Sequence, residues 1–305
     1  MPRLFCRGLA AAAVAAMLPA AKAVAHGFAG DRFFPATILT DDPFVANEIS
    51  LPTVTLNPTQ SDGSRELDVG PDLSMRITPD IGFTIGSDWQ RIRAPGMPNV
   101  TGWGGLETGF QYQLFINGPH EALALAALNV SWANTGNAAV GAPDFTTLSP
   151  TFDFGKGFGD LPASLSPLRP FALTGNLSID FPTKTQSMGE QNANSFNYGF
   201  AIEYSIPYLQ SEVRDIGLGP PFNRMIPLVE FALNSPFNRG LAGTTTGTVQ
   251  PGVIWAGPYF QIGAEMIIPT NGLSGHGIGG VVQLHFYLDD IFPNSIGRPI
   301  SQWFR

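Results

Sequence analysis

The chain has 305 residues, among them 35 glycines and 27 prolines, and a formal net charge of −8. Charged residues make up only 13% of it, about half of the roughly 25% in an average soluble domain. This argues against a helical protein covered by lysine and glutamate. The net negative charge and the lack of long basic runs exclude nucleic acid as a partner, because phosphate binding needs clustered lysine and arginine.

The first 25 residues predict a secretory signal peptide. Arg3 and Arg7 precede a short alanine-rich apolar stretch, and an Ala-x-Ala site ends at Ala25. A transmembrane helix is the competing interpretation, but the stretch is interrupted before about 20 apolar residues are reached. Cys6, the single cysteine, lies inside the predicted signal, so the mature chain would begin at His26 without disulfides.

After residue 25, apolar and polar residues alternate in segments of about ten residues bounded by Pro, Gly, Asn and Asp. Period-two alternation between turn residues is typical of antiparallel strands. In chain order, the predicted strands are 49–56, 73–78, 81–89, 104–115, 122–132, 147–158, 171–181, 195–206, 225–233, 248–256, 259–268 and 279–288. This gives about twelve strands, in a range of 10 to 14.

Strands with one apolar face either pack as a soluble sandwich or close as a barrel. The apolar faces here carry large residues, whereas the opposite faces hold Gly, Ala, Ser, Asn, Gln and isolated acids rather than dense Lys and Glu. Aromatic residues also recur near strand ends, as the two interfaces of a bilayer require. We therefore predict an all-β fold: a transmembrane, antiparallel, up-and-down β-barrel in the outer membrane of a Gram-negative bacterium.

This fold divides the chain into four parts. Residues 1–25 are the signal peptide and 26–47 an N-terminal periplasmic segment. The barrel spans 48–290, and 291–305 form a C-terminal tail. The last strand has the alternation that outer-membrane barrels present to their assembly machinery, so that machinery and outer-membrane lipids are the expected partners.

The acids inside the predicted strands are the first candidate site. In lipid each would cost a few kcal/mol near the midplane, so the alternation predicts that they face the lumen: Glu107, Asp180, Glu203, Glu230 and Glu265. Such acids either bias a pore toward cations or pair with inward basic residues and brace a closed interior. The candidates for those basic partners are Arg76, Arg91 and Lys156.

Three segments carry a family resemblance: 104–115 (GGLETGFQYQLF), 149–162 (SPTFDFGKGFGDLP) and 258–271 (PYFQIGAEMIIPTN). They resemble bacterial exported proteins described as outer-membrane barrels or transporters, similar to the "meta-pathway of phenol degradation" barrel proteins. The resemblance implies passage of small compounds, hydrophobic ones among them. It carries over no catalytic residues.

Enzymatic and metal motifs are scarce, so we predict a non-enzymatic channel for small molecules or ions, without a cofactor. No Gly-x-Ser-x-Gly or His-Glu-x-x-His sequence occurs, and His26, a possible copper ligand, has no second ligand nearby. Two alternatives stay open. A lipid-acting hydrolase requires His120, His276 or His285 near a serine. A closed structural or sensor barrel requires a lumen filled by side chains or by residues 26–47.

Overall fold

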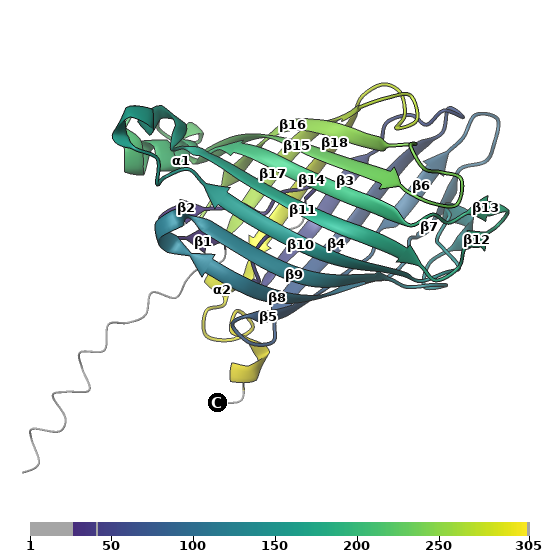
Figure 1. The fold of residues 1–305 in the computed structure, drawn as a ribbon, viewed down its shortest axis with the longest axis horizontal. Helices are drawn as coiled ribbons and strands as arrows, with labels where there is room; N and C mark the ends of the chain where they lie inside the picture. The colour runs from purple at the N-terminus through teal and green to yellow at the C-terminus, as the bar shows by residue number, and fades with distance from the viewer. Residues whose placement is uncertain (1–26, 41, 304–305) are drawn as a thin grey trace, which may run out of the picture.

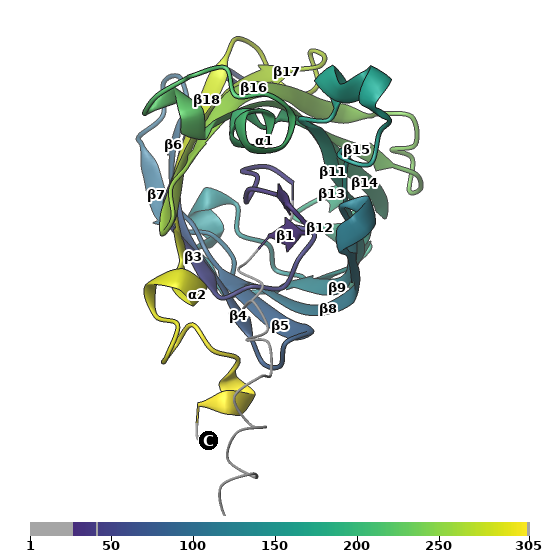
Figure 2. The same ribbon diagram turned by 90° about the vertical axis from the view of Figure 1, so that its left-hand side faces the viewer.

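The computed structural model describes residues 27–40 and 42–303. The predicted signal peptide and His26 lie outside these residues. Twelve strands form a closed antiparallel barrel, in which each strand pairs with its neighbours in the chain and β3 pairs with both β4 and β18 (Figure 2). In chain order they are β3 (Glu48–Leu56), β4 (Arg65–Arg76), β5 (Ile81–Gly86), β8 (Glu107–Asn117), β9 (Ala122–Ser131), β10 (Thr147–Gly157), β11 (Phe171–Pro182), β14 (Ser195–Tyr204), β15 (Met225–Pro236), β16 (Thr246–Ala256), β17 (Phe260–Pro269) and β18 (Gly279–Tyr287). The predicted fold and strand number are confirmed.

The alternation in β8 shows how the sequence builds the wall. Phe110, Tyr112 and Leu114 are 53%, 49% and 45% exposed on the outer surface. Gln111 and Gln113, between them, are buried in the interior. Successive side chains of a strand point to opposite faces, so the apolar set faces outward and the polar set lines the lumen.

One part of the wall is irregular. The register shifts between Gln283 and His285 where β18 pairs with β3, and between Ser50 and Thr53 where β3 pairs with β4. Nearby, residues 87–88 separate β5 from β6 (Trp89–Arg93), which pairs with β4 and with β7 (Val100–Trp103). Extra residues in a ladder re-aim side chains and increase the local twist. In β3 the lumen-facing positions accordingly change from even (Glu48, Ser50) to odd (Thr53), whereas β4 and β18 keep their alternation.

The remaining elements are short and lie at the two ends. The end that carries β1 (Phe28–Ala29), β2 (Arg32–Phe33), α1 (Ile206–Tyr208) and α2 (Leu288–Ile291) is called the terminal end. The opposite, distal end carries β12 (Gln186–Ser187) and β13 (Glu190–Gln191) (Figure 1). The other short helices are η1 (Gly118–His120), η2 (Ala138–Val140), η3 (Ala163–Leu168), η4 (Leu209–Val213), η5 (Phe222–Arg224) and η6 (Ile300–Gln302). Within the described residues, no helix is long and apolar enough to cross a membrane.

Residues 27–40 and 42–47 lie inside the ring of strands and are called the N-terminal plug (Figure 2). The segment enters at the terminal end, forms the β1–β2 hairpin and leaves into β3. Its location corrects the expectation of a periplasmic segment. The physical reason is twofold. Apolar side chains of the plug pack against a few apolar residues of the wall, and polar side chains of the wall accept hydrogen bonds from the plug backbone.

Candidate functional site: the barrel lumen and its N-terminal plug

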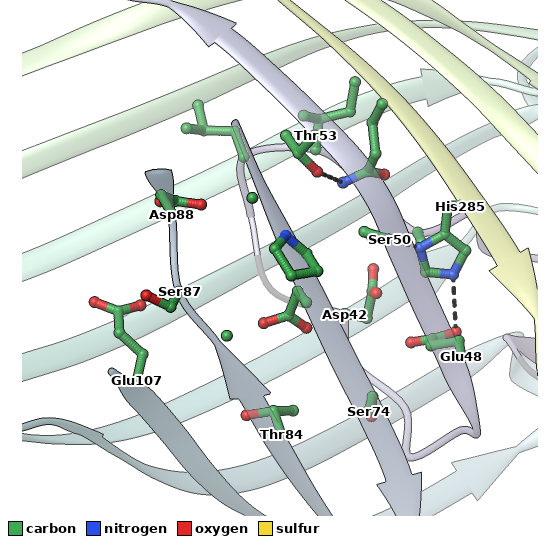
Figure 3. A pocket seen from close by; sticks show the side chains of 18 of the residues that line it. Asp42, Glu48, Ser50, Thr53, Ser74, Thr84, Ser87, Asp88, Glu107 and His285 are labelled. Carbon is green, nitrogen blue, oxygen red and sulfur yellow. Dashed lines mark hydrogen bonds and ion pairs between the residues drawn. The ribbon is translucent and has the colours of Figure 1, made fainter. Parts of the chain in front are cut away.

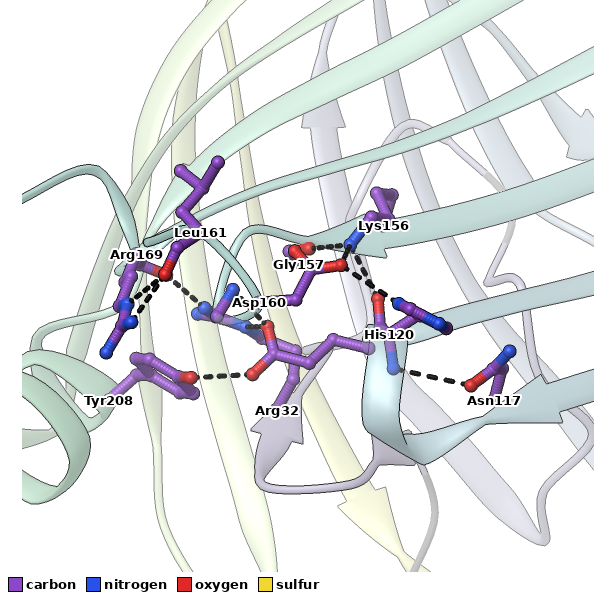
Figure 4. Close-up of polar contacts among 11 residues, drawn as sticks. Arg32, Asn117, His120, Lys156, Gly157, Asp160, Leu161, Arg169 and Tyr208 are labelled. Carbon is purple, nitrogen blue, oxygen red and sulfur yellow. Dashed lines mark hydrogen bonds and ion pairs between the residues drawn. The ribbon is translucent and has the colours of Figure 1, made fainter. Parts of the chain in front are cut away.

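A buried arginine fixes the plug at the terminal end. Arg32 is 0% exposed, and its Nε donates to Glu121 Oε2 at 3.1 Å. Its Nη1 donates to the carbonyl of Pro170 at 3.1 Å, and its Nη2 donates to the carbonyl of Arg169 (Figure 4). A buried guanidinium is tolerated only when a carboxylate and carbonyls satisfy it, so these contacts fix the position of the β1–β2 hairpin.

Tyr208 of α1 completes this anchor. Its hydroxyl donates to Glu121 Oε1 at 2.6 Å, and the Arg32 guanidinium lies 3.6 Å from its ring centroid. Burial, together with the hydrogen bond to Glu121, raises the pKa of Tyr208 above its ordinary value. The phenol therefore remains a hydrogen-bond donor at physiological pH, and it ties the helix after β14 to the plug.

Glu230 binds the tip of the plug. This fully buried carboxylate of β15 accepts hydrogen bonds from the backbone amides of Ile38, Leu39 and Thr40 at 2.9, 3.2 and 2.9 Å. The Thr40 hydroxyl donates to the same carboxylate at 3.2 Å. Hydrogen bonds to a charged acceptor are about twice as strong as neutral ones. Glu230 therefore holds the tip against β15 near the middle of the barrel.

A third anchor comes from β8. Gln113 Oε1 accepts from the amide of Val45 at 2.9 Å, and its Nε2 donates to the carbonyl of Pro43 at 3.1 Å. Apolar contacts support this part of the plug in a buried cluster: Ala29, Phe34, Phe44, Ala46, Leu123 and Ala172. Plug and wall thus share a small hydrophobic core in an otherwise polar lumen.

The structure places all five acids singled out in the sequence on the lumen face, in different surroundings. Glu203, 1% exposed, accepts a hydrogen bond from Thr174 at 3.2 Å, and Glu265 is buried beside Glu230. Asp180 lies at the distal end, where Ser149 donates to it at 2.6 Å. Glu107 accepts from Ser131 at 3.0 Å and lines a cavity. One acid thus holds the plug, and another borders an internal space.

That space, called the lumen cavity, measures about 350 Å³ and lies between the plug tip and the wall of β3, β4, β5, β8 and β18. Side chains from the wall and the plug point into it (Figure 3). Its lining includes five carboxylates and one histidine: Asp42, Glu48, Asp72, Asp88, Glu107 and His285. The irregular part of β3 borders it, and there Ser50 and Thr53 both line the cavity although they differ in parity.

A second cavity of about 700 Å³ lies at the terminal end. Phe28 and Phe33 of the plug line it together with Tyr208 and with Tyr287 of β18. The two cavities share no lining residue within the described chain. Residues of the plug line both cavities: Phe28 and Phe33 the one at the terminal end, and residues 36–40 the lumen cavity.

A serine, a histidine and an acid form a chain in the wall of the lumen cavity. His285 Nδ1 lies 2.9 Å from Ser50 Oγ, and its Nε2 lies 3.2 Å from Glu48 Oε2. All three side chains are buried, and Ser50 and His285 are direct cross-strand partners. This meets the distance condition that the hydrolase alternative sets for His285.

The other two histidines differ. His120 Nδ1 lies 3.2 Å from Asp160, and His276 pairs through its backbone with Thr59. Across the described part of the chain, no three His, Cys, Asp or Glu side chains are grouped so that they would hold a metal ion.

The three basic candidates do not brace the lumen acids. Arg76, at the terminal end of β4, donates to Asp289 of α2 at 2.6 Å. Lys156 shares the outward alternation of Phe152 and Phe154, and its Nζ donates to the His120 carbonyl at 2.6 Å. The expectation that Lys156 faces the lumen is therefore wrong.

Arg91 also lies on the other face. In β6 it is Gln90 that lines the lumen cavity, and Arg91 follows it on the opposite side of the strand. Arg91 shares the odd parity of Ile81, Phe83 and Ile85 in β5, so the plain alternation already gives its outward face, and the even positions Thr84, Gly86 and Gln90 line the cavity. The expectation for Arg91 is corrected for this reason.

The fold defines the class: a closed, twelve-stranded antiparallel β-barrel with the architecture of outer-membrane barrels. One similar solved structure is an outer membrane channel from Pseudomonas putida F1, with 12% identity and a TM-score of 0.53 over 79% of this chain and 95% of that one. The NanC porin (8% identity, TM-score 0.47, 77% and 98%) and the β domain of the Bordetella autotransporter BrkA (12%, 0.45, 80% and 99%) are more distant. No protein-family model and no curated protein matches the sequence.

Proposed function

We propose that this protein is an outer-membrane channel whose lumen is closed by its own N-terminal plug, and that small solutes pass when the plug leaves its seat. The observation that carries the proposal is the pair of cavities, one on each side of the plug. In this proposal the terminal end faces the periplasm, and the cell's barrel assembly machinery inserts the exported chain.

The lining of the lumen favours ions and small polar molecules. Of the two cavities, the one facing the distal end is lined by carboxylates, hydroxyls and amides. Hydrophobic compounds, which the resemblance to the phenol-pathway barrels implies, would have to displace water from these groups at a cost of about 1–3 kcal/mol per unpaired polar group. We therefore assign the passage role to ions and polar solutes first.

A reversible cross-link tests the proposal. A Cβ atom added at Gly199 of β14 would lie 2.8 Å from Thr40 Cγ2, so cysteines at these two positions are placed for a disulfide. In planar bilayers, we expect the Thr40→Cys/Gly199→Cys protein to be silent when oxidised and to conduct after reduction. Locking the plug tip to the wall should block the passage.

Two controls sharpen this experiment. The single variant Gly199→Cys should conduct equally with and without reductant, because it cannot cross-link. Heat-modifiable migration of both variants on gels would show that the barrel has folded. A wild-type protein that neither conducts nor admits solutes into liposomes, or a cross-linked protein that conducts like the reduced one, would overturn the proposed channel.

A second candidate function rests on Ser50, His285 and Glu48. A hydrolase needs a serine, a histidine base and an acid that orients it, and these residues lie in that order of contact. A serine-reactive fluorophosphonate probe should then label the wild type and Ser74→Ala but not Ser50→Ala. Ser74 is a suitable control because it lines the same cavity and donates to the Ala46 carbonyl. Wild-type protein that stays unlabelled would eliminate this candidate.

A further inference from the structure

The lumen cavity carries a charge of one sign. Five carboxylates line it, from β3, β4, the β5–β6 junction, β8 and the plug. Among the described residues that line it there is no lysine or arginine. Charged walls around a confined space concentrate ions of the opposite sign. The cavity therefore attracts a cation.

Glycines in the wall make room for two of these carboxylates. A Cβ atom at Gly70 would lie 1.8 Å from Asp88 Oδ1, and one at Gly86 would lie 2.6 Å from Asp72 Oδ2. Any larger residue at either position would displace a carboxylate. The backbone of β4 and β5 is thus shaped to hold both acids beside the cavity.

Two buried amides add a second, independent observation. Gln111 and Gln283 line the cavity and are 8% and 7% exposed, and the Oε1 atom of each has no hydrogen-bond partner among the described residues. The Nε2 of Gln283 donates to Thr53 Oγ1 at 3.2 Å, which turns the carbonyl oxygen away from Thr53. A buried acceptor without a partner is destabilising, so both oxygens favour a ligand that donates hydrogen bonds.

These features together specify the ligand chemistry. The carboxylates require positive charge, and the amide oxygens require N–H or O–H donors. The described residues offer no cluster for direct metal ligation, and about 350 Å³ exceeds the volume of a bare ion. We propose that the lumen cavity is a binding site for small organic cations of the ammonium or guanidinium class, which on the proposed channel function are the solutes that pass.

Calorimetric titration of the purified full chain in detergent, at low ionic strength, tests this site. The probe is 1,4-diaminobutane, with 1,4-butanediol as its uncharged analogue and succinate as an anion. We expect the diamine to bind and the other two to give no heat. The double variant Asp72→Asn/Glu107→Gln should weaken diamine binding at least about tenfold, because it removes two of the charges.

Two further variants separate a built site from a general negative field. Gln111→Leu removes one unpartnered acceptor without changing the charge, and it should weaken diamine binding about tenfold, as expected for a lost hydrogen bond to a charged group. Asp180→Asn removes a lumen acid outside the cavity and should leave the affinity unchanged. Equal binding of the diol, or equal weakening by Asp180→Asn and the double variant, would overturn the site.

The failure of this site and the failure of the channel are distinguishable. Conductance that depends on the cross-link but no diamine binding would leave the channel and remove the cation site. Diamine binding with no conductance in any variant would leave the site and remove the channel. Binding that persists in the double variant would show that the ligand lies elsewhere in the barrel.

Discussion

The two walls of the lumen use the same kind of residue for different purposes. On the β14–β17 side, Glu230 is fully buried and accepts three backbone amides of the plug. On the β3–β8 side, Glu107 accepts the Ser131 hydroxyl and lines the lumen cavity. Both acids face the lumen from strands in which apolar and polar residues alternate. Their roles differ because the plug tip lies against Glu230, whereas Glu107 lines the cavity between the tip and the opposite wall.

This comparison is tested most strongly at the Arg32 anchor. Arg32→Met removes the buried ion pair with Glu121 while keeping much of the side-chain volume. Breaking a buried pair costs about 3–5 kcal/mol, so the seated plug should lose a large part of its stability. We expect the open probability in planar bilayers to rise strongly.

The matched control is Lys156→Met, which removes a basic side chain on the outer face near the same end. It should leave gating unchanged. If Arg32→Met conducts like the wild type, the anchor does not hold the plug closed.

A smaller effect is expected at Glu230. Glu230→Gln keeps the shape of the side chain but leaves one acceptor oxygen, in place of two, for the amides of the plug tip. Losing charge-assisted hydrogen bonds costs about 1–3 kcal/mol, so opening should be facilitated less than by Arg32→Met. Glu107→Gln, on the open wall, should alter ion selectivity without altering the open probability. If Glu230→Gln and Glu107→Gln changed the open probability equally, the two acids would not differ in their roles.

The smallest effect is expected outside the lumen, at Asp160. Hydrogen bonds from Lys156 and His120 hold the pKa of this carboxyl below its ordinary value. A lowered pKa in the folded state stabilises above the ordinary carboxyl pKa of about 4, and this contribution is lost as the pH falls through the lowered value. Because the pair is exposed, thermal unfolding of Asp160→Asn at pH 7 should match the wild type. A clear drop in the unfolding temperature would contradict this.

The fold follows closely from the sequence because alternation is a local property. Residues 104–115 already separate Phe110 and Tyr112 from Gln111 and Gln113, and the same rule holds in most strands. It breaks in β3, where two residues separate the lumen-facing Ser50 and Thr53. Arg91 shares the odd parity of Ile81, Phe83 and Ile85, so the rule gives its outward face. For Lys156 the rule itself would have given the right face, since Phe152 and Phe154 share its parity.

The site was much less predictable. The bonds that seat the plug join residues far apart in the chain, such as Arg32 with Glu121 and Thr40 with Glu230. Glu121 lies in a turn and Gln113 is an uncharged member of a strand, so neither stands out by type. The signal in the sequence was the recurrence of large apolar residues in 26–47, among them Phe28, Phe33, Phe34 and Phe44.

A distance measurement tests most directly that the plug leaves its seat. Cys6, the only cysteine, lies in the predicted signal peptide, so spin labels at Leu39→Cys and at the exposed distal residue Met188→Cys would be the only ones on the mature chain. Pulsed electron resonance in lipid should give two distance populations, and Arg32→Met should shift the balance toward the one in which Leu39 has left the lumen. A single distance, unchanged in Arg32→Met, would contradict a movable plug.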